Sequence, residues 1–167
     1  MKLLRSDLLA GFSDKLFEIP VNTLNLTGLE FRQEIIICKL SSESIPEGFK
    51  LKGSLAFSFL NRCDRCLEKI EDFHNPAFKL WLTSNTDLIR DENMDVILFP
   101  NSMSVINLKN VFQDFIILED PMKYLCKNDC KGLCQHCGLN LNNNSCNCVT
   151  FSTDASFDVL NTHGQVK

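Results

Sequence analysis

The chain has 167 residues, a length that fits one domain or one domain with a small appendage. Apolar residues make up 44% of it and charged residues 23%, which excludes a disordered or collagen-like chain. Seventeen basic and twenty-one acidic residues give a net charge of −4, so bulk charge does not draw the chain to nucleic acid. Any contact with nucleic acid must therefore come from a local cluster of cations.

Apolar runs in the sequence are short and reach four or five residues, as at 35–38. A membrane-spanning helix needs about 20 apolar residues, so we expect none. Arg5 and Asp7 interrupt the apolar N-terminal stretch, which does not have the pattern of a signal peptide. We therefore expect a cytoplasmic protein. In that reducing compartment, clustered cysteines are metal ligands or redox groups before they are disulfides.

The first clear strand signal comes from three consecutive isoleucines at 35–37. Their β-branched side chains predict a strand over residues 29–40, followed by a turn or loop over 41–48. Cys38 shares one face of this strand with the apolar residues two positions away on either side. We expect Cys38 to be a small buried core residue.

Residues 51–60 carry the clearest pattern, because apolar and polar side chains alternate along them. This period predicts a half-buried strand that runs into a CxxC motif at Cys63 and Cys66. Residues 67–82 form a second strand-like stretch, in which Pro76 predicts a bulge or break. The two stretches predict an antiparallel hairpin with the CxxC motif at its tip.

The second half of the chain predicts one principal helix. Residues 83–95 are polar and acidic and predict a mobile surface loop, which a short strand over 96–99 follows. Apolar residues then recur at i, i+3, i+4 and i+7, which predicts a helix over 107–119 with Asn107 as its N-cap. The helix should end there because Pro121 disfavours helical geometry at the preceding residue.

The nine cysteines are the most distinctive feature of the sequence. Eight of them cluster, since six lie within 23 residues and a CxxC pair lies about sixty residues upstream. Eight thiols make two sets of four, which is the number that two tetrahedral zinc ions with all-cysteine ligands require. The predicted ligands of two Zn²⁺ per chain are Cys63, Cys66, Cys126, Cys130, Cys134, Cys137, Cys146 and Cys148.

Two partitions of these ligands fit the spacing. The first joins the upstream pair to the first two cysteines of the later cluster and leaves the last four together, since the Asn-rich loop over 138–145 can fold back. The second partition groups Cys126, Cys130, Cys134 and Cys137, and it leaves Cys63 and Cys66 with Cys146 and Cys148. Either way a site spans distant segments and couples metal binding to folding, so we expect Cys66→Ser to destabilise the whole domain.

Other uses of these thiols are less consistent with the pattern. Eight exposed free thiols would oxidise, and a reducing compartment would not keep so many disulfides. Redox CxxC pairs usually lie at a helix N-terminus, whereas this one is expected on a hairpin. The alternative function is a rubredoxin-type thiol or iron redox protein, because CxxC pairs also hold iron. A DNA-binding zinc ribbon is disfavoured by the acidic balance, and no catalytic motif is present, so we expect no enzyme.

Basic residues cluster around the cysteines. They either offset the negative charge of the metal sites or form a patch that faces phosphates, and the sequence leaves both interpretations open. A compact patch requires that the upstream pair and the first later pair share one ion. The residues of this possible RNA or partner patch are Arg62, Arg65, Lys69, Lys123, Lys127 and Lys131.

These elements predict an α+β fold, mainly an antiparallel β-sheet that is curved or barrel-like, with one principal helix and a cysteine-rich zinc-binding C-terminal segment. The expected division is a β-rich domain over residues 1–125 and a zinc-binding segment packed on it over 126–148. A polar tail over 149–167 should dock as a short segment or fray.

The order of these motifs resembles the YceD family, the large ribosomal RNA subunit accumulation proteins. Cys-Asp-Arg-Cys at 63–66, Cys-Lys-Gly-Leu-Cys at 130–134 and Asn-Leu-Asn at 140–142 carry the resemblance, which extends over about 29–148. It implies a bacterial, non-enzymatic factor for the synthesis, processing or stability of 23S ribosomal RNA in ribosome biogenesis. Its partner would be a large-subunit assembly intermediate, through RNA or a ribosomal protein, with no membrane involved; the sequence leaves the direct partner and the oligomeric state open.

Overall fold

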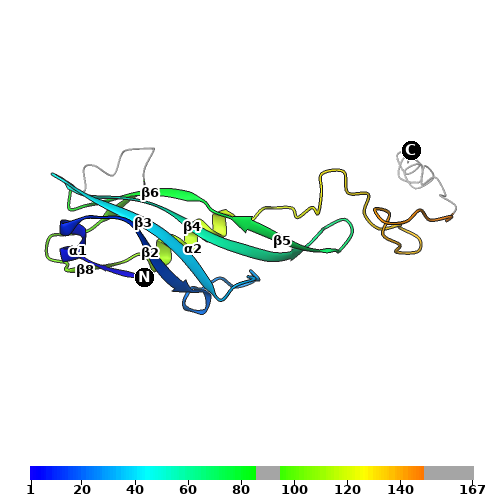
Figure 1. The fold of residues 1–167 in the computed structure, drawn as a ribbon, viewed down its shortest axis with the longest axis horizontal. Coiled ribbons are helices and arrows are strands. Elements are labelled where there is room, and N and C mark those ends of the chain that lie inside the picture. Colours follow the sequence, from blue (N-terminus) through cyan, green and yellow to red (C-terminus); the bar gives the residue numbers. More distant parts are fainter. Residues whose placement is uncertain (86–94, 149–167) are drawn as a thin grey trace, which may run out of the picture.

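The computed structural model describes residues 1–85 and 95–148, and most of them lie in β-strands (Figure 1). The strands are β1 (Lys2–Leu4), β2 (Phe12–Pro20), β3 (Ile35–Ile45), β4 (Gly48–Arg62), β5 (Lys69–His74), β6 (Ala77–Thr83), β7 (Asp95–Leu98) and β8 (Val105–Asn107). The helices are α1 (Arg5–Ala10), the short 3-10 helix η1 (Val21–Thr23) and α2 (Lys109–Leu118). Most of the predicted loop over 83–95 and the whole predicted tail over 149–167 lie outside the described residues.

The main sheet is open. Its strand order is β2-β3-β4-β6-β7, and β5 pairs with the far end of β4. All pairs are antiparallel except β6 with β7. The strands and helices together confirm the α+β prediction. Among the described strands, β2 and β7 stay at opposite edges and do not pair, so the barrel-like form of that prediction is not confirmed. No helix of the described residues is long and apolar enough to cross a membrane.

The predicted hairpin is confirmed, and one long strand, β4, carries both halves of it. The first half of β4 pairs with β6 over Gly48–Ser54, and the second half pairs with β5 over Phe57–Arg62. The break between β5 and β6 falls at Pro76, which has no N–H to give to the ladder. Figure 1 shows the β4–β5 end projecting well beyond the rest of the sheet.

Two boundaries differ from the sequence-based prediction. The strand predicted over 29–40 is β3, which starts six residues later and runs through most of the stretch predicted as a turn or loop. Backbone groups of the serine-rich segment pair with β4 whatever their side chains are, as in Ser42 with Leu51. The helix predicted over 107–119 is α2, which runs from Lys109 to Leu118. Its N-cap is Leu108 and not the predicted Asn107, whose Oδ1 accepts the Lys109 N–H at 3.1 Å from one residue before the cap.

One core lies between the inner faces of the sheets and α2. Phe112 and Ile116 of α2 are buried, and the ring of Phe78 on β6 packs against Phe112 at a centroid distance of 5.4 Å. Cys38 is fully buried, as predicted, and burial raises the pKa of its thiol to about 12. A second, smaller cluster of buried residues surrounds Cys63 at the tip and is separate from this core.

Candidate metal centres

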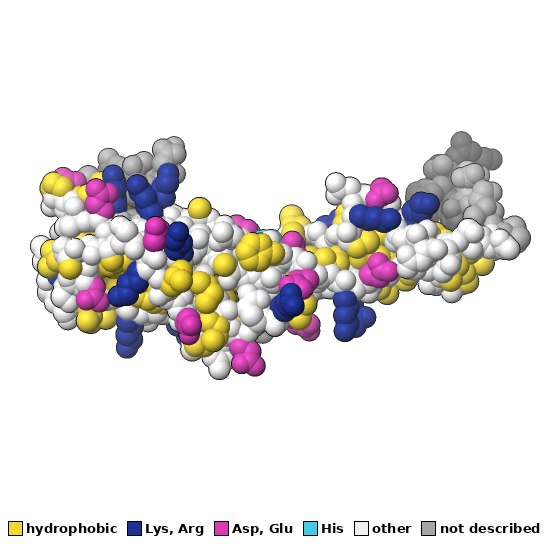
Figure 2. Space-filling view, viewed as in Figure 1, with side chains coloured by type: hydrophobic (Ala, Val, Ile, Leu, Met, Phe, Trp, Pro, Cys, Tyr) yellow, Lys and Arg dark blue, Asp and Glu magenta, His cyan; other side chains and the backbone are white. Residues whose placement is uncertain are grey.

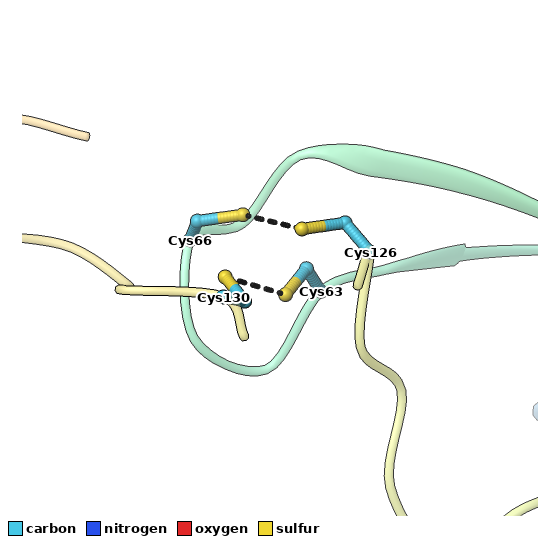
Figure 3. A group of neighbouring side chains, drawn as sticks. All are labelled: Cys63, Cys66, Cys126 and Cys130. Carbon is cyan, nitrogen blue, oxygen red and sulfur yellow. Dashed lines mark hydrogen bonds between the residues drawn. The ribbon is translucent and has the colours of Figure 1, made fainter. Parts of the chain in front are cut away.

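The first metal centre consists of Cys63, Cys66, Cys126 and Cys130, whose sulfur atoms all lie within 4.8 Å of one another. Figure 3 shows the four side chains pointing toward a common point, two from the hairpin tip and two from the segment after α2. The Sγ atoms of Cys63 and Cys130 are 3.7 Å apart, and those of Cys66 and Cys126 are 3.5 Å apart. Four sulfurs bound tetrahedrally at 2.3 Å would be about 3.8 Å apart, so this geometry fits one ion.

The tip loop holds the first pair of ligands in place through its backbone. The N–H of Cys63 donates to the carbonyl of Glu68 at 2.8 Å, and the N–H of Leu67 donates to the carbonyl of Cys63 at 2.9 Å. This turn needs a positive φ after its second cysteine, and Leu67 adopts φ 60° there while its side chain is 54% exposed. Leucine at this position costs free energy of order 1 kcal/mol relative to glycine.

The segment after α2 is brought to the tip by polar contacts along the hairpin. His74 Nδ1 on β5 lies 3.2 Å from Glu119 Oε2, directly after the helix. Further on, the Asp64 N–H donates to the Tyr124 carbonyl, and the Tyr124 N–H donates to Asp64 Oδ2, both at 2.8 Å. These two bonds place Cys126 beside the CxxC loop.

The second metal centre consists of Cys134, Cys137, Cys146 and Cys148, again with all sulfurs within 4.8 Å. Its CxxC loop repeats the bonds of the first, since the Cys134 N–H donates to the Leu139 carbonyl and the Gly138 N–H donates to the Cys134 carbonyl. Gly138 has φ 71° at the place that Leu67 occupies in the first loop. The cysteines are thus grouped as in the first of the two predicted partitions.

The electrostatics of both centres favour a bound cation. Burial raises the pKa of Cys63, but backbone N–H groups directed at its sulfur outweigh burial and lower it to about 6. Burial and the neighbouring thiols raise the pKa of Cys126 to about 12. In the second centre, backbone N–H groups lower the pKa of Cys134 to about 6, while the Cys137 thiol and burial raise that of Cys148 to about 12. Four thiolates this close repel one another, so ionising all of them requires a metal ion.

Asparagine side chains connect the two centres, which the cysteine spacing does not predict. Asn142 Nδ2 donates to Cys130 Sγ at 3.2 Å, and Asn142 Oδ1 accepts the Lys131 N–H at 2.9 Å. The side-chain amides of Asn140 and Asn143 both donate to Glu68 Oε1, at 3.1 and 3.2 Å. The loop predicted to fold back therefore also contacts the first centre, and its signal in the sequence was its Asn content.

Asn142→Ala should weaken metal binding at the first centre by about 10–100-fold, because it removes the side-chain donor to a ligand sulfur. Competition with a chromophoric chelator measures this loss of affinity. Asn144→Ala is the matched control, since within the described part of the chain the Asn144 side chain makes no hydrogen bond. Equal affinities for the two variants would contradict the assigned role of Asn142.

The six predicted cations all lie near the first centre and are all exposed. Arg62 and Lys69 are directly opposite each other, where β4 ends and β5 begins. Arg65 has a structural contact, since its guanidinium donates to the Cys130 carbonyl at 2.9 Å. Asp64, Glu68 and Asp129 lie close in sequence to these cations. The remaining members of the group are Lys123, Lys127 and Lys131.

Fold and site together define a β-sheet protein with one tetracysteine centre at the end of a long hairpin and a second in the segment that follows it. The family model described as "Large ribosomal RNA subunit accumulation protein YceD" matches residues 51–162, which include most of β4 and both centres. The chain belongs to the YceD family.

The individual relatives share about a third of their residues with this chain over the matched parts. A chloroplastic large ribosomal RNA subunit accumulation protein YCED homolog of Arabidopsis thaliana is 32% identical over 66 residues, 40% of this chain and 21% of the relative. Uncharacterized proteins of Mycobacterium tuberculosis and Mycobacterium bovis are 30% identical over 103 residues, 61% of this chain and 49% of theirs. The chain thus spans between a fifth and a half of the length of these relatives. No solved structure is significantly similar to the chain.

Proposed function

We propose that this protein is a non-enzymatic, zinc-binding factor that supports accumulation of large-subunit (23S) ribosomal RNA in the cytoplasm, through the synthesis, processing or stability of that RNA. Membership of the YceD family supports the process. The observation that carries the mechanism is the pair of tetracysteine centres, which build a rigid tip from segments with little apolar core of their own. The tip is the part of the molecule that contacts a large-subunit assembly intermediate.

Zinc is the metal that this arrangement favours. Each centre supplies four protein sulfurs and leaves no coordination position for a substrate, which is typical of structural zinc. Iron in the same ligand set would instead give a rubredoxin-type redox protein. Metal analysis of the purified protein should find two zinc ions per chain and no visible absorption. A red or brown protein containing iron would replace this proposal with the redox alternative.

The direct partner of the tip is proposed to be the RNA of the assembly intermediate. Like charges directly opposite each other in a β-ladder destabilise it, yet Arg62 and Lys69 face each other at the tip. A pocket of about 380 Å³ opens beside them, lined also by Asn61 and by the acidic Glu30. Within residues 1–85 and 95–148 no ion pair includes Arg62 or Lys69, so phosphate groups can neutralise both.

Reversing two tip charges tests this contact. The double variant Arg62→Glu/Lys127→Glu should keep two metal ions but lose co-sedimentation with large-subunit precursor particles, and it should not restore 23S ribosomal RNA in a strain that lacks the protein. Arg65 is left intact because its side chain supports the metal-binding loop. Lys2→Glu/Lys109→Glu changes the net charge equally on β1 and α2 and should behave as wild type.

Two results would overturn parts of the proposal. Full activity of the Arg62→Glu/Lys127→Glu variant would remove the tip as an RNA contact. A deletion strain with normal levels of large-subunit ribosomal RNA would contradict the proposed function itself.

A further inference from the structure

The outer face of the main sheet, opposite the core, carries a second group of cations. Lys39 on β3, Lys50 and Lys52 on β4 and Lys79 on β6 each alternate with buried neighbours, so their side chains point away from the core. Figure 2 shows Lys and Arg side chains gathered at the upper left, where β3 and β6 run in Figure 1. We call these four residues the lysine face.

The register of the sheet places these charges against one another. Lys52 and Lys79 are direct partners across the β4–β6 pair, an arrangement that destabilises a ladder. Lys39 is neutralised by Asp14 at 3.2 Å, and Glu43 is the direct partner of Lys50 on β3. In the part of the chain that the structure describes, Lys52 and Lys79 have no ion pair. The pair does not stabilise the sheet, and both amines are available to bind an external anion.

The surroundings of the lysine face suit a chain of phosphates. A pocket of about 560 Å³ lies beside it, and its lining includes Lys50, Lys52, Ser41 and Ser44, with Glu43 as its one acidic residue. Residues 9–13 also line this pocket. Amines and hydroxyls are the side chains that contact phosphate oxygens in nucleic-acid complexes.

An aromatic ring completes this surface. Trp81, the one tryptophan of the chain, is the direct partner of Lys50 and is half-buried on the same face. Proteins that bind single-stranded nucleic acid combine a cationic track with aromatic side chains on which bases stack. An acidic protein segment would use the lysines but would gain less from an indole ring beside them.

We propose that the lysine face is a second RNA-binding surface, which holds the phosphates of single-stranded RNA between Lys52 and Lys79 and a base beside Trp81. The inference rests on the proposed function, because it assigns a further contact to the same RNA partner. It is independent of the tip, since the lysine face lies on the body of the sheet (Figure 1).

Trp81 fluorescence supplies a direct test with a 20-nucleotide oligouridylate as the probe. At about 50 mM salt the RNA should quench Trp81 in a saturable manner. Lys79→Glu should weaken binding about tenfold and lower the slope of log K against log salt by about 0.7. The same substitution turns a repulsive cross-strand pair into an attractive one, so its unfolding midpoint should rise by about 1–4 °C. Lys2→Glu, with the same charge change, should alter neither property.

Each other outcome overturns the inference. The inference fails if the RNA does not quench the wild type, or if Lys79→Glu binds it as well as the wild type does. Equal quenching by polyglutamate would also overturn it, because the face would then be a docking site for acidic proteins. Loss of binding in Arg62→Glu/Lys127→Glu with full binding in Lys79→Glu would place the RNA at the tip alone. The proposed function would survive all of these results, because it is judged by ribosomal RNA levels in the deletion strain.

Discussion

Cys66→Ser is expected to release the ion of the first metal centre and to unfold the tip, while the main core stays folded. Cys63, Cys66 and Cys130 form a buried cluster of their own, which shares no residue with the buried core under the sheet. Structural zinc contributes roughly 10–16 kcal/mol of apparent binding free energy at neutral pH in zinc-finger peptides, which is more than the few apolar residues around these sulfurs can supply. This expectation replaces the whole-domain loss that the sequence alone predicts.

Metal analysis and hydrogen exchange measure this result. One ion per chain or fewer should remain, because the Asn142 and Glu68 contacts link the second centre to the first. The amides of Cys63 and Leu67 should lose their protection, whereas amides of β3 should keep theirs. Cys38→Ser is the opposite control, since it should keep two ions and destabilise the main core. Global unfolding of Cys66→Ser would show that core and tip form one cooperative unit.

Gly48→Ala should lower the stability of the sheet by about 3 kcal/mol or more. Gly48 begins β4 with φ 144°, and a Cβ atom there would lie 1.9 Å from the Leu82 carbonyl oxygen. Backbone atoms of β6 cannot move away without breaking the β4–β6 ladder, which begins at this residue. For a chain of this size the thermal midpoint should fall by roughly 6–12 °C, as measured by circular dichroism.

Gly28→Ala is the control that distinguishes the cost of the steric overlap at Gly48 from the cost of a positive φ. Gly28 also has a positive φ, of 88°, but a Cβ atom there would meet nothing within 4 Å. Its substitution should cost about 1 kcal/mol, the ordinary cost of a left-handed residue. Similar midpoints for the two variants would contradict the predicted clash at Gly48.

The sequence by itself determined the local features of this protein. Alternation of apolar and polar residues over most of 51–60 identified the long strand, because the period of two is a property of strand geometry alone. The 3.6-residue period identified α2 to within two residues at its start. The candidate ligands followed from thiol number and spacing, since four sulfurs per ion is coordination chemistry and does not depend on the fold.

The tertiary structure decided whatever depends on residues far apart in the chain. Both ligand partitions satisfied the spacing, and the two hydrogen bonds between Asp64 and Tyr124, sixty positions apart, favour one of them. The pairing of β1 with β8 joins residues about a hundred positions apart, and no local pattern announces it. The lysine face exists only because the register sets Lys52 against Lys79. Register and docking are set by the balance of the whole core, so no short window of sequence contains them.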